Sequence, residues 1–156
     1  SSTASQSLLD TKNIKNWRLG RAASMNIIPS TTGAAKAVGK IIPSLNNKLT
    51  GISYRVPTIN GSVVDLNLIL NSNPSINDIH KIIEQTNSKY IGFAPTACVS
   101  TDIIGNSLSS ILDKELSIKL CNMYKFVIWY DNEFGYSSRI VDLIFHIIKV
   151  NKRKRL

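Results

Sequence analysis

Polar residues that could bind an anion gather between positions 30 and 55. Ser30, Thr31 and Thr32 offer three consecutive hydroxyl groups, and Gly33 follows them before a run of good helix formers, AAKAVGKII. Hydroxyl side chains at a helix start bond its free N–H groups, and those groups with the helix dipole attract anions. Arg55 ends a short segment beyond the helix, so its guanidinium could complete a phosphate site. From the pattern alone a plain N-cap at Thr32 and a surface charge at Arg55 are favoured, because such caps are common.

Longer strings in the sequence carry more information than this spacing. STTGAAKAVGK, RVPT, SVVDL and WYDNEFGYS are specific strings in one fixed order. Together they resemble the catalytic domain of phosphorylating glyceraldehyde-3-phosphate dehydrogenase, from Ser1 to about Ile148. The resemblance implies a glycolytic oxidoreductase that converts glyceraldehyde 3-phosphate and inorganic phosphate to 1,3-bisphosphoglycerate with NAD. It also implies a homotetramer in the cytoplasm.

The resemblance assigns roles residue by residue. The family's phosphate-binding positions fall on Thr3, Arg21, Thr32, Gly33 and Arg55. Asn132, in YDNEFGY, matches the residue that hydrogen-bonds the nicotinamide carboxamide and sets which ring face meets the substrate. Tyr136 is expected to pack beside the nicotinamide ring. Without the resemblance, a capped helix start at Asn132 and a core aromatic at Tyr136 would be the simpler interpretation.

The nucleophilic cysteine and the basic histidine of the family have no counterpart in this sequence. In the family the histidine immediately precedes the position of Ser1, and the cysteine and the Rossmann domain lie further upstream. We therefore expect a segment of a longer enzyme that is inactive by itself. Cys98, Cys121, His80 and His146 match other positions, and both histidines are expected to be structural, His80 on a helix surface. A free-standing, non-catalytic domain that binds nucleic acid or partners through its basic end is the alternative.

Composition limits the classes of protein that fit. The chain has 156 residues, 43% hydrophobic and 19% charged, as expected of one globular domain. No apolar run is long enough to span a membrane. Two distant cysteines argue against a zinc site or a disulfide framework and favour a reducing compartment. We expect residues 1–148 to form the catalytic domain, with residues 1–21 as a long loop that matches the family's S-shaped loop.

The net charge of +9 is partly a property of residues 149–156, a basic tail. Its five basic residues are Lys149, Lys152, Arg153, Lys154 and Arg155. A basic tail can bind nucleic acid, but a solvated helix end is commoner, and basic residues suit a helix C-terminus. No known nucleic-acid-binding module accompanies the tail, so nucleic acid is not the partner that we expect.

Periodicity predicts an α+β fold with a mixed, largely antiparallel sheet and helices on one face. Strands are expected at 26–29, 51–57, 62–70, 90–95, 98–101, 109–112 and 120–130. Helices are expected at 32–45, over about twelve residues after a cap at Ser75, and at 137–149. Three apolar stripes are expected to be buried on these helices: Val38, Ile41, Ile42 and Leu45; Ile76, Ile79, Ile82 and Ile83; and Ile140, Leu143, Ile144, Ile147 and Ile148.

Overall fold

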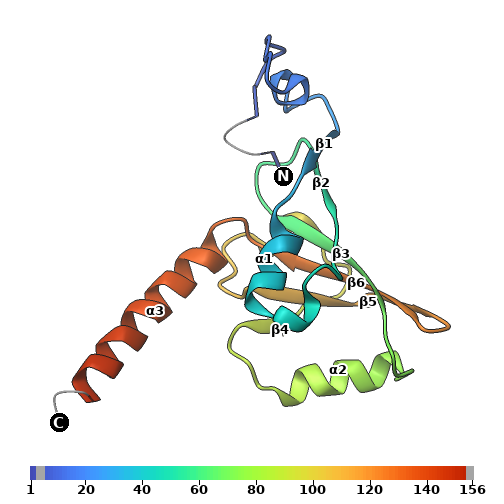
Figure 1. Ribbon diagram of the computed structural model, residues 1–156, viewed down its shortest axis with the longest axis vertical. Helices are drawn as coiled ribbons and strands as arrows, with labels where there is room; N and C mark the ends of the chain where they lie inside the picture. Colours follow the sequence, from blue (N-terminus) through green and yellow to red (C-terminus); the bar gives the residue numbers. More distant parts are fainter. Residues whose placement is uncertain (3–5, 154–156) are drawn as a thin grey trace. The chain divides into compact units, whose positions relative to one another are not determined.

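A computed structural model describes residues 1–2 and 6–153 and divides the chain into two compact units, Ser1–Ile59 and Asn60–Leu156. The first unit contains η1 (Trp17–Gly20), β1 (Ile28–Thr31), α1 (Ala34–Ile41), η2 (Pro43–Leu45) and β2 (Ile52–Arg55), where η marks a short 3-10 helix. The second contains β3 (Ser62–Ile69), α2 (Ile76–Gln85), β4 (Ile91–Phe93), η3 (Ser100–Ile103), β5 (Ser110–Leu120), β6 (Met123–Tyr130) and α3 (Phe134–Arg153) (Figure 1). Within the described part of the chain, no helix is both long and apolar enough to cross a bilayer.

The first unit is built on an antiparallel ribbon of β1 and β2. Before it, the loop expected at the N-terminus folds back on itself around the buried side chain of Gln6. The Gln6 amide donates to the carbonyl oxygens of Arg18, Leu19 and Arg21 at 3.0, 3.2 and 2.7 Å. Residues 6–21 of the loop are therefore tied together by hydrogen bonds, with η1 as the one 3-10 helix among them.

The helix expected at 32–45 is shorter in the structure, where α1 ends at Ile41. Pro43 explains the difference, because proline cannot donate a helical hydrogen bond and disfavours a helical conformation in the residue before it. Ile42 accordingly has φ −118° and ψ 87°. The apolar stripe predicted on this helix is not buried within the chain, since the side chain of Ile41 is 81% exposed.

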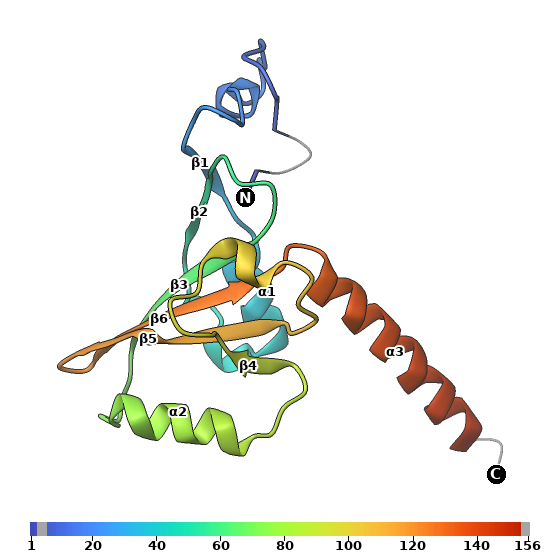
Figure 2. The same cartoon turned by 180° about the vertical axis from the view of Figure 1, so that it is seen from behind.

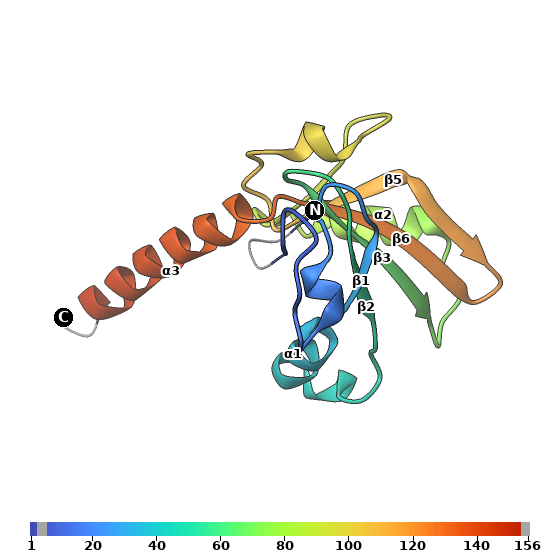
Figure 3. The same cartoon turned by 90° about the horizontal axis from the view of Figure 1, so that it is seen from above.

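The second unit is organised by a four-stranded sheet in the order β3-β6-β5-β4. β6 pairs antiparallel with both β3 and β5, and β4 pairs parallel with β5. Figure 3 shows β5 and β6 side by side as a long hairpin, which turns at Cys121 with φ 55°. The prediction of a mixed, largely antiparallel sheet is confirmed.

α2 covers one face of this sheet (Figure 2). The predicted cap is present, since Ser75 and Asp78 form a capping box with the Ser75 hydroxyl accepting from the Asp78 N–H at 3.1 Å. Ile76, Ile79 and Ile83 pack on a core of Leu112, Tyr124 and Phe126. Ile82 is the one member of the predicted stripe that points outward, at 60% exposed.

His80 is buried, which corrects its expected place on the helix surface. Its ring is 8% exposed, lies edge-on to Phe93 with centroids 6.1 Å apart, and places Nε2 3.0 Å from the Ser117 hydroxyl. Ser117 belongs to a part of β5 that the sequence did not predict, beyond an irregularity between Asp113 and Ile118. Burial lowers the pKa of His80, and the nearby charge of Lys114 lowers it further.

The other sheet face is covered in part by the segment 94–108. Cys98 and Ile103 pack there on Ile111 of β5. The strand expected at 98–101 is absent from this described region, because residues 100–103 form the 3-10 helix η3. Asp102 favours this turn, since its carboxylate accepts from the Val99 N–H at 2.8 Å.

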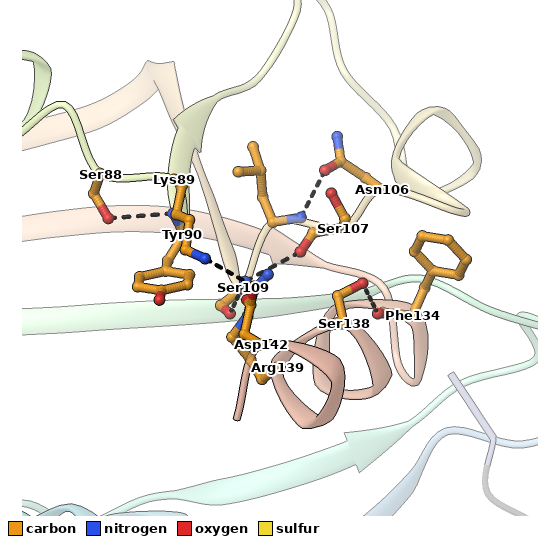
Figure 4. A network of polar contacts seen from close by, with 11 residues as sticks. Ser88, Lys89, Tyr90, Asn106, Ser107, Ser109, Phe134, Ser138, Arg139 and Asp142 are labelled. Carbon is orange, nitrogen blue, oxygen red and sulfur yellow. Dashed lines mark hydrogen bonds and ion pairs between the residues drawn. The ribbon is translucent and has the colours of Figure 1, made fainter. Parts of the chain in front are cut away.

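α3 is longer than predicted at both ends and continues to Arg153, so Lys149 and Lys152 are helical residues. Its expected apolar stripe is not buried in this chain, since its members are 43–56% exposed. The first turns are fixed by Arg139, whose Nε lies 2.8 Å from Asp142 and whose guanidinium lies 4.5 Å from the Tyr90 ring centroid (Figure 4). Arg139 also donates to Ser109 Oγ at 3.1 Å, which ties α3 to the loop before β5.

Candidate functional site

The β1–β2 ribbon decides which candidate anion ligands share a face. Its register pairs Ser30 with Ser53 and Ile28 with Arg55. Directly paired residues point to the same side of an antiparallel ribbon, and alternate residues along one strand do so as well. Arg55 and Ser53 therefore lie on the same face as Ser30, and the Ser53 hydroxyl donates to the Ser30 carbonyl at 3.1 Å.

The start of α1 lies at the other end of the ribbon. Thr32 Oγ1 accepts the N–H of Ala34 at 3.2 Å, so the hydroxyl satisfies a first-turn donor as predicted. The N-cap position itself belongs to Gly33, which has no side chain to cap the helix. A Cβ atom added to Gly33 would meet nothing within 4 Å among the described residues. The helix start is therefore open in front of its N–H groups.

Arg55 is half-buried at the end of β2 and has no carboxylate within ion-pair distance among the described residues. The N–H of Ser2 donates to the Thr58 carbonyl at 3.3 Å, which holds residues 1–2 close to this strand end. Burial, and after it the charge of Arg55, lowers the pKa of the Ser1 amino group, so the two positive groups are near each other. Thr3 falls outside the described residues.

Arg21 is placed differently from Arg55, because it already has an acidic partner. Its Nε donates to Asp10 Oδ1 at 3.1 Å, and the same oxygen accepts from the Ala22 N–H at 2.8 Å. Both bonds lower the pKa of Asp10, and the bond from the Ala22 N–H has the larger effect. Both side chains of the pair are more than half exposed, so the ion pair is weak.

The first unit carries most of the chain's positive charge. Residues 1–59 contain eight lysines and arginines against the single acidic residue Asp10, a net of +7 out of the chain's +9. Besides the basic tail, the unit that holds Arg55 and the start of α1 is therefore strongly positive. Such a surface attracts anions of any class.

The second candidate site is the loop between β6 and α3, which contains Asn132. The β3–β6 register pairs Ser62 with Tyr130, so the residues just before β3 come opposite those just after β6. The Ser62 hydroxyl donates to Asn132 Oδ1 at 2.6 Å, and the Asn132 N–H donates to Asn60 Oδ1 at 3.3 Å. The Asn132 amide is half-buried and held in one orientation.

Asp131 is a site residue that the sequence reasoning missed. Its carboxylate is 5% exposed and accepts four hydrogen bonds: from Asn60 Nδ2 at 2.9 Å, and from the backbone N–H groups of Gly105, Glu133 and Phe134 at 2.9, 2.8 and 2.6 Å. Burial acts to raise the pKa of Asp131, but these bonds outweigh it and hold the pKa below its ordinary value. Asp131 rather than Asn132 caps α3. An aspartate just ahead of a helix is a recognisable cap signal, so the residue could have been found.

Tyr136 lies in the first turn of α3 and is 70% exposed, so the interpretation as a core aromatic is wrong. The neighbouring Phe134 is 51% exposed. A shallow hollow of about 250 Å³ lies against this loop, lined by Asn60, Gly105 and Phe134 among others. The start of α3 thus presents aromatic surface beside the fixed Asn132 loop.

The cysteines and histidines show no activated thiol in the described part of the chain. Cys98 is buried in the small core under β5, and burial raises the pKa of its thiol. Cys121 is exposed at the hairpin turn. His80 bonds to Ser117 instead of a thiol. A nucleophilic cysteine needs a base or another device that lowers its pKa, and the burial of Cys98 acts in the opposite direction.

Comparisons with known proteins show which family the chain belongs to. A sequence model of the family described as glyceraldehyde 3-phosphate dehydrogenase, C-terminal domain, matches residues 1–132, a range that includes Asn132 but not Tyr136. A cytosolic glyceraldehyde-3-phosphate dehydrogenase of Arabidopsis thaliana is 53% identical over 152 residues, which are 94% of this chain and 45% of the relative. The cytosolic enzyme of Nicotiana tabacum is 52% identical over 95% of this chain and 47% of its own length.

A glyceraldehyde-3-phosphate dehydrogenase of Phytophthora infestans is also 52% identical, over 94% of this chain and 46% of its own length. The chain thus spans about half the length of the curated relatives that it matches. The matches cover nearly all of the chain. The chain therefore belongs to the glyceraldehyde 3-phosphate dehydrogenase family, of which it carries the C-terminal domain.

Proposed function

We propose that this chain is the catalytic domain of an NAD-dependent, phosphorylating glyceraldehyde-3-phosphate dehydrogenase of glycolysis. The complete enzyme would oxidise glyceraldehyde 3-phosphate in the presence of inorganic phosphate to 1,3-bisphosphoglycerate. The observation that carries the proposal is the β1–β2 ribbon, which presents Arg55, without a carboxylate partner among the described residues, at one end and the start of α1 at the other. A strand rises about 3.4 Å per residue, so Thr32 and the level of Arg55 are separated by roughly 13 Å of backbone, enough for two anions.

The residues of this chain would bind and orient the two phosphates. Arg55 supplies a charge-assisted contact, with Thr3 proposed as a hydroxyl donor to the same phosphate. Thr32 and the Gly33 N–H would receive the second anion at the helix start. Arg21 would contribute once a doubly charged phosphate competes with Asp10 for its guanidinium. The net charge of +7 on the first unit would raise the local concentration of these anionic substrates.

The second unit would contact the cofactor. NAD supplies the hydride acceptor when it is bound, and the residues of this chain suit the nicotinamide end of it. The Ser62 hydroxyl donates to Asn132 Oδ1 at 2.6 Å and so orients the Asn132 amide. A side-chain amide of this kind can form hydrogen bonds with the carboxamide of a partner. Tyr136 offers an exposed ring next to Asn132. Both residues would orient the nicotinamide, so that one ring face meets the substrate.

The wider setting follows from the relatives. We propose that residues 1–148 act as one catalytic domain, with residues 1–21 as the S-shaped loop and 149–156 as a basic tail. We also propose that the complete enzyme is a homotetramer of the cytosol, as the names of the plant relatives indicate for their compartment. These 156 residues alone should not turn over, because neither cysteine among them is activated.

The test is a hybrid enzyme in which these 156 residues replace the matching part of the Arabidopsis relative. A hydrogen bond to a charged group contributes about 1.5–3 kcal/mol, so Arg55→Ala should raise the KM for glyceraldehyde 3-phosphate about tenfold to a hundredfold. The KM for NAD should stay unchanged. Lys48→Ala removes a positive charge from the same unit without touching the ribbon face and serves as the control.

Any of three results would contradict the proposal. One is an Arg55→Ala hybrid with the kinetics of the unsubstituted hybrid. Another is NADH formation by the isolated 156-residue polypeptide, which would place a working nucleophile within it. A well-folded but inactive unsubstituted hybrid would also refute the catalytic assignment.

A further inference from the structure

The loop between β6 and α3, which contains Asn132, is held by side chains from the first residues of the second unit. Asn60 and Ser62 flank the turn that enters β3, about seventy residues before the loop. They meet the loop because the antiparallel register continues beyond the last pair, Ser62 with Tyr130. The eight residue pairs between β3 and β6 therefore bring the two segments together.

Asn60 uses both ends of its amide. Its Nδ2 donates to Asp131 Oδ2 at 2.9 Å, while its Oδ1 accepts the N–H of Asn132 at 3.3 Å and of Gly61 at 2.7 Å. One side chain thus bridges the buried carboxylate of Asp131 and the backbone of Asn132. Ser62 then fixes the side-chain amide of Asn132 at 2.6 Å, so backbone and side chain are held separately.

The turn that carries these two residues packs closely against a neighbouring segment. Gly61 has φ +87°, a conformation that residues with a Cβ rarely adopt. A Cβ at this position would lie 2.5 Å from the Ser100 carbonyl oxygen, so the turn packs directly on η3. Asp131 adds a second anchor, since it also accepts the Gly105 N–H at 2.9 Å. The loop is therefore clamped between the 60–62 turn and the 100–105 segment.

We infer that Asn60 and Ser62 are positioning residues for the cofactor: they hold the Asn132 amide in the orientation that meets the nicotinamide carboxamide. The inference rests on the proposed function of Asn132. Ser62 fixes the rotation of the amide, because its hydroxyl donates to the carbonyl oxygen and so defines which edge of the amide carries oxygen. Asn60 fixes the position of the loop backbone, because its amide bonds both the Asp131 carboxylate and the Asn132 N–H. Neither residue needs to touch the cofactor itself.

The experiment uses the hybrid enzyme described above. Loss of one hydrogen bond corresponds to about a threefold to tenfold change in an equilibrium, so Ser62→Ala should raise both the Kd for NAD, measured by calorimetry without substrate, and the KM for NAD by that factor. The KM for glyceraldehyde 3-phosphate should stay unchanged. Ser62→Thr keeps the hydroxyl and should restore the KM. Ser138→Ala is the matched control, because the Ser138 hydroxyl bonds only to the Phe134 carbonyl of its own helix in the described structure.

A double-mutant cycle separates positioning from general destabilisation. If Ser62 acts through Asn132, Ser62→Ala should have no further effect on the KM for NAD in the Asn132→Ala background. Asn60→Ala should behave in the same way. Full additivity of the two changes, or an unchanged KM for NAD in both Ser62→Ala and Asn60→Ala, would overturn the inference.

The cycle also distinguishes this inference from the proposed function. If Asn132→Ala leaves the KM for NAD unchanged, the cofactor contact itself is wrong. If Asn132→Ala raises that KM but Ser62→Ala and Asn60→Ala do not, the contact stands and only the positioning role fails.

Discussion

Replacing Asp131 should destabilise the second unit strongly. Its carboxylate is 5% exposed and accepts four hydrogen bonds, three of them from backbone N–H groups. Asp131→Ala leaves these donors without their acceptor and removes the cap of α3, a cap that is worth about 1 kcal/mol by itself. Removing one partner from a buried charged network costs about 3–5 kcal/mol. We expect a loss of that size in the free energy of unfolding. It is smaller than the sum of four lost hydrogen bonds, because water can reach some of the donors.

The assay is urea unfolding of the 156-residue chain at pH 7, followed by circular dichroism, with hydrogen exchange at the amides of Gly105 and Phe134. Asp131→Ala should lower the free energy of unfolding by about 3–5 kcal/mol and speed exchange at both amides. Asp131→Asn keeps one oxygen but turns an NH₂ group toward two donors, so we expect about half that loss. It serves as the milder variant if the alanine variant does not fold.

The pH dependence follows from the lowered pKa of Asp131. An aspartate whose pKa is lower in the folded state stabilises the fold above its ordinary pKa of about 3.9, and this stabilisation is lost as the pH falls through the folded value. The difference between the unsubstituted chain and Asp131→Asn should therefore be largest at neutral pH. It should shrink as the pH is lowered below about 4.

Asp65→Ala is the matched control, because Asp65 is an exposed aspartate of β3 whose ion pair with Lys125 spans 2.8 Å. Exposed pairs contribute about 0–1 kcal/mol, so the control should unfold almost like the unsubstituted chain. The reasoning would be refuted if Asp131→Ala cost no more than Asp65→Ala, or if exchange at Gly105 and Phe134 were unaffected. Either result would mean that the buried network does not stabilise the loop.

Three further predictions concern other parts of the chain. His80 has a lowered pKa in the folded chain, so as the pH drops the unfolded chain binds a proton at this residue before the folded chain does. Stability should therefore fall as the pH drops below about 6.5. In His80→Gln, the plot of the urea midpoint against pH should lack this decrease. Gly61→Ala should cost about 1–3 kcal/mol in urea unfolding because its φ is positive and its Cβ would clash, whereas Gly51→Ala, with nothing within 4 Å, should be nearly neutral. Cys121 should react quickly with a thiol reagent and Cys98 only on unfolding; equal rates in the folded chain would contradict the burial of Cys98.

Local sequence signals predicted the features that depend on neighbouring residues. The helix cap at Ser75 and the strand expected at 62–70 are confirmed, because each is decided mainly by neighbouring residues. Pro43 is also a local signal, but the helix expected at 32–45 did not take it into account. Proline ends the helix, so that prediction was wrong at its C-terminal end.

Features that depend on sheet pairing could not be predicted. His80 lies one position from the apolar stripe of its helix and was therefore expected at the surface, whereas β5 continues beyond Leu112 and brings Ser117 beneath α2. The stripe on α3 was correctly recognised as apolar, yet its residues are half exposed in this chain. Periodicity identifies an apolar face but contains no information on what covers it.

The sequence by itself determined the family, the α+β class and the identity of the candidate ligands, since these are written in contiguous strings such as STTGAAKAVGK and WYDNEFGYS. Only the tertiary structure decided which of those ligands are available and how they are held. Arg21 has an acidic partner and Arg55 has none among the described residues. Asn132 meets Asn60 and Ser62 across about seventy residues because strand register, a property of the whole sheet, brings them together.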